Sequence, residues 1–109
     1  MASTDEIYMT IRGKGGHGAQ PHQNIDPIVA MAQVITALQQ EVSRVASPII
    51  PSVLSFGKVI ANGATNIIPN EVYLEGTFRT LDEEWRAKAH ESIVKIAKGI
   101  SESLGCQIA

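Results

Sequence analysis

The sequence is poor in cysteine and has no concentration of positive charge. Cys106 is its one cysteine, which excludes an internal disulfide and a metal site built from several thiolates. A single cysteine fits a reducing compartment, and we expect a cytoplasmic location. Nine Lys and Arg residues stand against eleven Asp and Glu, for a formal net charge of -2. Without a basic cluster, neither nucleic acid nor a membrane surface is an expected partner.

Long apolar runs are also absent. No stretch approaches the roughly 18 apolar residues of a membrane span. The opening Met1-Ala2-Ser3-Thr4 lacks the apolar centre of a signal peptide, and we expect residues 1–5 to be a leader left by cloning. The 109 residues are 44% hydrophobic, enough for one buried core but not for two. Residues 6–109 are therefore predicted to form a single domain.

Alternation of apolar and polar residues predicts strands. In 6–14, Ile7, Met9 and Ile11 alternate with Tyr8, Thr10 and Arg12, the two-residue period of a strand with one buried face. Segments 53–61 and 72–79 follow the same rule. Residues 106–109 are typical of the opening of a fourth strand.

Two segments predict helices. Asp26-Pro27 favours a helix start, and the predicted helix covers 27–45 with an apolar stripe of Ile28, Met31, Ile35, Leu38, Val42 and Val45. Further apolar residues in its first half indicate burial against a second surface, for which a partner helix is the natural candidate. The run 80–83 fits a capping box. It predicts a second helix that ends before Gly105, with an inward stripe of Trp85, Ala89, Ile93, Ile96 and Ile100.

The order is strand, helix, strand, strand, helix, strand. Right-handed crossovers turn this order into an α+β fold, a four-stranded antiparallel sheet with both helices on one face. The arrangement is the ferredoxin-like βαββαβ fold.

A glycine-rich loop follows the first predicted strand. In Gly13-Lys14-Gly15-Gly16-His17-Gly18, the glycines let the backbone and the His17 imidazole approach a ligand. The alternative is an exposed, inert histidine. The run is no phosphate-binding loop, because that motif ends in Gly-Lys-Ser/Thr and leads directly into a helix. We expect His22 to brace its own loop with a hydrogen bond and His90 to face solvent on the second helix.

Two more polar residues are candidates for binding. Arg79 ends the third strand on its open face, where a guanidinium suits a carboxylate. Its alternative is an ion pair with Glu75 or Asp82. Asn66 is either a plain turn residue or an amide donor held by the Ile-Ile-Pro that follows. The sequence holds no metal-ligand spacing and no complete nucleophile, base and acid set.

Taken together, 13–22 with 25–28, Asn66-Ile67-Ile68-Pro69 and Gly76-Thr77-Phe78-Arg79 resemble one known domain. It is the dimerisation, or lid, domain of the di-zinc aminoacylase/carboxypeptidase family. The nearest branch is that of hippurate hydrolase, N-acyl-amino-acid amidohydrolases and auxin-conjugate hydrolases. The resemblance runs from Glu6 to the end of the chain.

The resemblance implies a lid inserted in a larger catalytic domain that cleaves N-acyl amino acids or similar small amides. Two divalent metal ions, zinc or manganese, belong to that absent domain, so the isolated chain is expected to bind no metal and to be inactive. His17 would stabilise the oxyanion in the partner subunit's site, on a loop suited to a mobile donor. Asn66 and Arg79 would hold the substrate.

The same resemblance implies a homodimer, which we expect to form through the second strand and the first helix. The alternative from another functional class is a free-standing ferredoxin-like module that binds a small ligand or regulates another protein.

Overall fold

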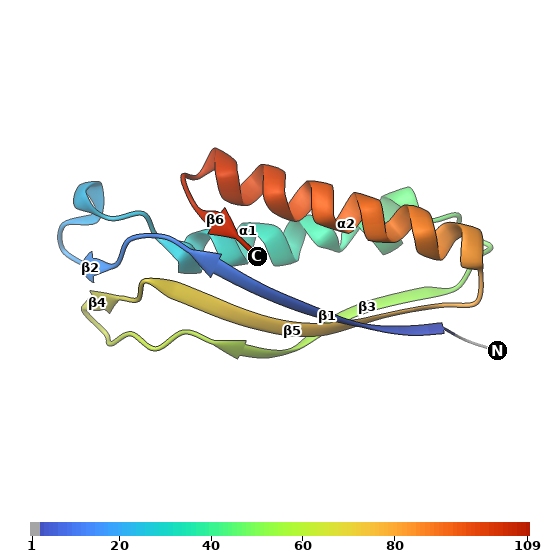
Figure 1. Cartoon of the computed structure of the whole chain (residues 1–109), viewed down its shortest axis with the longest axis horizontal. Coiled ribbons are helices and arrows are strands. Elements are labelled where there is room, and N and C mark those ends of the chain that lie inside the picture. The colour runs from blue at the N-terminus through green and yellow to red at the C-terminus, as the bar shows by residue number, and fades with distance from the viewer. Residues whose placement is uncertain (1–2) are drawn as a thin grey trace.

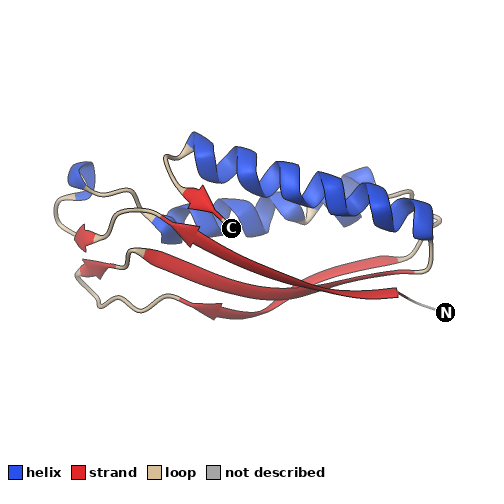
Figure 2. Ribbon diagram, viewed as in Figure 1, coloured by secondary structure: helices blue, strands red, loops and turns tan. Residues whose placement is uncertain are grey.

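A computed structural model describes residues 3–109 as a four-stranded sheet covered on one face by helices, with a separate two-stranded sheet at one end (Figures 1 and 2). The long strands are β1 (Ser3–Arg12), β3 (Ser52–Ile60) and β5 (Glu71–Thr80), with a short β6 (Gln107–Ile108). The helices are α1 (Pro27–Leu38) and α2 (Glu83–Ser103). Shorter elements are β2 (Gly16–His17), the 3-10 turn η1 (Pro21–Gln23), the π-helical turn η2 (Glu41–Val45) and β4 (Ile67–Ile68).

The strand order confirms the predicted ferredoxin-like fold. The four-stranded sheet runs β3-β5-β1-β6 and every neighbouring pair is antiparallel. The two central strands are therefore β5 and β1, and β3 forms one edge. The other edge is mostly β1 itself, because β6 pairs only with Ile11 and Arg12.

Strand β1 starts earlier than the sequence predicts. Ser3, Thr4 and Asp5 were expected to precede the domain, yet all three pair with β5. The alternation that marks a strand begins only at Glu6, so the pattern gave no sign of them. Residues 1 and 2 of the expected leader lie outside the described residues.

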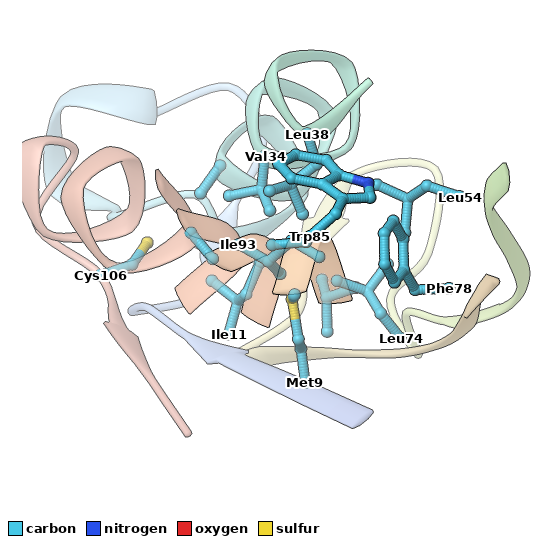
Figure 3. Close-up of a cluster of buried hydrophobic side chains, with 14 residues drawn as sticks. Met9, Ile11, Val34, Leu38, Leu54, Leu74, Phe78, Trp85, Ile93 and Cys106 are labelled. Atoms are coloured by element: carbon cyan, nitrogen blue, oxygen red, sulfur yellow. The ribbon is translucent and has the colours of Figure 1, made fainter. Parts of the chain in front are cut away.

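The core lies between the sheet and the two helices (Figure 3). The Trp85 and Phe78 rings meet edge to face, with centroids 6.3 Å apart and planes at 69°, a favoured arrangement for aromatic pairs. Trp85 also donates its indole N–H to the Ser52 hydroxyl at 2.8 Å. This bond satisfies the polar atom of an otherwise buried ring and ties α2 to the start of β3.

The predicted helix 27–45 is real but irregular, and its predicted stripe is partly wrong. The buried positions of α1 and η2 are Pro27, Ala30, Val34, Leu38 and Glu41. Ile28 and Val45 are 37% and 52% exposed. The small Ala30 and the slim Val34 face inward because they let the helix approach the sheet closely, which leaves bulkier neighbours at its flanks.

The second helix begins at a different cap from the predicted one. Asp82 accepts the Trp85 amide through Oδ1 at 2.8 Å, so Asp82 is the N-cap of α2. Thr80 instead completes β5. The predicted inward positions Trp85, Ala89 and Ile93 are buried. Ile96 and Ile100 are only partly buried, because the deepest row continues through Ala97 and Ser101.

The second half of β3 buries neither of its faces. A β-bulge shifts the register between Phe56 and Lys58, and every residue from Gly57 to Ile60 is exposed. Val59 and Ile60 keep 45% and 40% of their surface exposed. An apolar strand edge left open in this way is a site for pairing with another strand.

Candidate functional site: the histidine loop beyond the sheet

The loop that carries His17 pairs with the segment that carries Asn66. Strand β2 lies antiparallel to β4, with His17 opposite Ile67. The Gly18 amide donates to the Asn66 carbonyl at 2.8 Å. Both strands extend past the helices at one end of the molecule (Figure 1). Two candidates that are far apart in the sequence are thus neighbours in the fold.

This pairing depends on Gly15. A Cβ at this position would lie 2.1 Å from the Ile68 carbonyl oxygen, far inside van der Waals contact. Only glycine lets the two backbones approach this closely. The density of glycine in the loop was visible in the sequence, but nothing in the sequence identified the backbone that Gly15 approaches.

Hydrogen bonds hold the His17 loop along most of its length. The Gly15 amide donates to Asn70 Oδ1 at 2.9 Å. The His17 carbonyl accepts from the Gln20 amide and from Asn24 Nδ2, both at 3.0 Å. Glycine content predicted a mobile loop, whereas these bonds leave it little local freedom. Asn24 does the bracing that was expected of His22, for which the described residues show no hydrogen bond.

The side chains of His17 and Asn66 are exposed. His17 Nδ1 accepts the Ala19 amide at 3.1 Å. The other ring nitrogen, Nε2, has no hydrogen-bond partner among residues 3–109, nor has the Asn66 side-chain amide. The end of the molecule therefore carries two polar side chains without an internal partner, and each can donate a hydrogen bond to an oxyanion or a carbonyl oxygen.

Arg79 lies far from this pair. It is near the end of β5, opposite Val53 and Thr4, while Asn70 and the His17 loop adjoin the start of that strand. The length of strand between Asn70, beside the His17 loop, and Arg79 is roughly 30 Å, at about 3.3 Å per strand residue. One copy of the chain does not bring all three predicted site residues together.

The two ion pairs that were alternatives for Arg79 are not formed. Glu75 accepts the Tyr73 hydroxyl at 2.8 Å and pairs with Lys58, and Asp82 caps α2. In the described part of the chain, the exposed guanidinium of Arg79 has no carboxylate partner. Arg79 is accordingly available to a carboxylate from outside the chain.

His90 is exposed on α2, as predicted, and it also has a partner. Its Nε2 lies 2.8 Å from Asp5 Oδ2, and Arg86 Nε donates to the same carboxylate at 2.7 Å. The Arg86 hydrogen bonds, helped by His90, lower the pKa of Asp5 to about 2. This cluster ties the start of β1 to α2 and is fully explained as a structural contact.

No described group of His, Cys, Asp and Glu residues is placed to hold a metal ion. Cys106 is buried, which raises the pKa of its thiol. A groove of about 570 Å³ runs between β1 and α2 and is lined by residues such as Ile7, Met9, Ile93 and Val94. It lies away from His17. Within residues 3–109, no helix is long and apolar enough to cross a membrane.

Comparison with known proteins gives consistent results. The profile of the peptidase dimerisation domain family matches residues 5–103. An N-acyl-L-amino acid amidohydrolase of Geobacillus stearothermophilus is 48% identical over 105 residues, which is 96% of this chain and 28% of that protein. An N-acetylcysteine deacetylase of Bacillus subtilis is 41% identical over 107 residues, 98% of this chain and 28% of that one.

Solved structures agree in fold. A crystal structure from methicillin-resistant Staphylococcus aureus matches with a TM-score of 0.95 and 33% identity, covering 99% of this chain and 28% of that one. A dinuclear metal-binding peptidase of Bacillus subtilis matches with a TM-score of 0.74 and 32% identity, covering 99% and 24%. The chain thus spans about 28% of the length of the curated relatives it matches, and it belongs to the peptidase dimerisation domain family.

Proposed function

We propose that this chain serves as the dimerisation and lid domain of a metal-dependent amidohydrolase that cleaves N-acyl amino acids or similar small amides. The observation that carries the proposal is that two exposed donors, His17 Nε2–H and the Asn66 amide, lie on paired backbone segments beyond the sheet. These two donors can assist a reaction whose nucleophile and base are supplied by another domain or subunit.

His17 fits the role of oxyanion donor. Attack on an amide carbonyl builds negative charge on its oxygen, and one positioned donor contributes about 3 kcal/mol to lowering the barrier. Asn66 fits a donor that orients the substrate. Arg79 suits the carboxylate of an amino acid, to which a guanidinium binds through two parallel hydrogen bonds.

The distance between Arg79 and His17 supports a site shared by two subunits. We infer a two-fold dimer in which β3 pairs antiparallel with the partner's β3, next to α1. The start of each β3 then lies beside the end of the other, and Arg79 is opposite Val53 near that start. Three strand spacings, roughly 14 Å, would separate the two β5 strands across the interface. Arg79 of one subunit thereby approaches the His17 loop of the other.

The metal ions are assigned to a catalytic domain outside this chain. The described residues do not fit a metal, since they contain no group of three or more possible ligands. We therefore propose that this chain's residues bind and orient the substrate and stabilise charge. The cytoplasmic location stays a prediction.

A chimaera tests the proposal. The segment of the Geobacillus amidohydrolase that matches this chain is replaced by the chain, and hydrolysis of an N-acetyl amino acid is measured. His17→Ala should lower kcat by roughly two to three orders of magnitude with normal metal content. Arg79→Ala should mainly raise KM. His22→Ala is the matched control and should act like the unmodified chimaera. Unchanged kcat in His17→Ala would refute the role of His17.

A further inference from the structure

The His17 ring is held by a bond that selects its tautomer. Nδ1 accepts the Ala19 amide at 3.1 Å, so this nitrogen presents a lone pair and carries no proton. In the neutral imidazole the proton is then on Nε2. Nε2 is the nitrogen without a partner in the described part of the chain. The loop thus presents a neutral N–H donor before any substrate arrives.

The Ala19 bond requires the turn from His17 to Gln20 to keep its shape. The Gln20 amide closes that turn on the His17 carbonyl at 3.0 Å. Asn24 Nδ2 donates to the same carbonyl oxygen at 3.0 Å. Gly16 makes room for this contact, because a Cβ there would lie 2.3 Å from Asn24 Oδ1. Asn24 therefore holds the turn from one side.

Asn70 holds the loop from the other side, as a hydrogen-bond acceptor where Asn24 is a donor. Its Oδ1 accepts the Gly15 amide at 2.9 Å, directly before β2. Asn70 itself is fixed at the start of β5, where its carbonyl accepts the Gly13 amide at 2.8 Å. One asparagine thus acts as a donor to the loop and the other as an acceptor.

We propose that Asn24 and Asn70 are positioning residues that set the orientation and tautomer of His17, so that Nε2–H is presented as a preorganised donor. The inference rests on the proposed function for its catalytic consequence. Its structural content concerns this chain alone. Preorganised donors stabilise developing charge without reorganising during the reaction, which a freely rotating histidine does not achieve.

The same substitution should disturb the loop at Asn24 and leave it nearly unchanged at Asn70. Asn24→Asp keeps the shape of the side chain but removes the donor, so the bond to the His17 carbonyl is lost. Asn70→Asp keeps the acceptor for the Gly15 amide. If the asparagines only filled space, both aspartates would be tolerated alike. Asn62→Asp, at a turn residue without a described side-chain bond, is the matched control.

The first readout is the tautomer of His17 in the 109-residue chain, measured from the ¹⁵N chemical shifts of its ring by NMR. The unmodified chain, Asn70→Asp and Asn62→Asp should show the proton on Nε2. Asn24→Asp should show a mixture of tautomers. Thermal unfolding establishes that each variant is folded. Gly16→Ala, which displaces Asn24 by another route, should repeat the Asn24→Asp spectrum and replaces it if that variant does not fold.

The second readout is kinetic, in the chimaera. Asn24→Asp should lower kcat about 10- to 100-fold with little change in KM, since a donor displaced by about 1 Å costs up to about 100-fold. Asn70→Asp should stay within about twofold of the unmodified chimaera. A proton on Nδ1 in the unmodified chain, or equal effects of the two aspartates, would overturn the inference. Unchanged kcat in His17→Ala would instead refute the proposed function and leave the tautomer result standing.

Discussion

At the scale of single residues, close backbone approach decides how His17 is presented. The sequence identified His17, Asn66 and Arg79 as candidates, and the structure brings the first two together. Their contact could not be predicted, because two paired residues on each side, β2 and β4, are too short to give an alternating pattern. Asn24 and Asn70 were missed for a related reason. Asparagine is common in turns, and its partners become visible only in three dimensions.

Gly15 should tolerate no side chain. Gly15→Ala sets a Cβ against the Ile68 carbonyl at 2.1 Å, so β2 and β4 must separate. We expect a loss of at least about 1 kcal/mol in the free energy of unfolding, together with faster hydrogen exchange of the Gly18 amide. Gly18→Ala is the control, because its Cβ would be 3.4 Å from the Asn66 carbonyl oxygen. Equal stability of the two variants would contradict this account of the loop.

At the scale of elements, periodicity found the strands and helices but not which helix residues face the core. The central strands alternate regularly, so their faces were predicted correctly. In α1 nearly every position of the first half is apolar, so the pattern could not choose a face, and the small Ala30 and Val34 turned inward. The cap of α2 was misplaced because Thr80 and Asp82 are both good capping residues.

The cap of α2 can be tested directly. Asp82→Ala removes the acceptor of the Trp85 amide and should lower the free energy of unfolding by about 1 kcal/mol. Chemical denaturation of the purified chain measures this. Glu84→Ala, two residues later in the same helical turn and exposed, should change stability by less than about 0.5 kcal/mol. A cost for Glu84→Ala equal to that of Asp82→Ala would argue against the cap.

The contact between β1 and α2 should weaken in acid. The Arg86 hydrogen bonds lower the folded-state pKa of Asp5 from 3.8 to about 2, so the ionised carboxylate stabilises the fold above about pH 4. That stabilisation is lost as the pH falls from about 4 to about 2. Asp5→Asn should cost about 1 kcal/mol at pH 7, after allowance for solvent screening, and about nothing at pH 2.

The control for this prediction is Glu84→Gln, which should follow the pH dependence of the unmodified chain. Denaturation curves between pH 2 and pH 7 provide the comparison. If the difference between Asp5→Asn and the unmodified chain did not shrink on acidification, the ion pair would not be the source of the stability.

At the scale of the whole molecule, the features combine into an elongated body of 48 × 23 × 20 Å. The His17 loop is beyond one end of the sheet, Arg79 is near the other end of β5, and the open second half of β3 lies along one side. The fold class followed from the order of elements in the sequence. The separation of Arg79 from His17 did not, because it depends on which end of β5 each residue adjoins.

Dimerisation should depend on the edge of β3. Val59→Lys adds a charge to the exposed half of that strand and, in a two-fold dimer, to both subunits at once. We expect sedimentation of the unmodified chain to show dimers at high micromolar concentration and Val59→Lys to shift them to monomers. Val94→Lys, at a 56% exposed position of α2, should leave the dimer intact. A chain that is monomeric at that concentration would contradict the interface.

The most direct measurement mixes two defective chimaeras, His17→Ala and Arg79→Ala, and assays the hybrid dimers at subsaturating substrate. If each site takes His17 from one subunit and Arg79 from the other, one site of every hybrid is intact. Random mixing makes half of the dimers hybrids, so about a quarter of the unmodified activity should return. Activity no higher than the average of the two parents, with both folded and dimeric, would show that His17 and Arg79 do not act from different subunits.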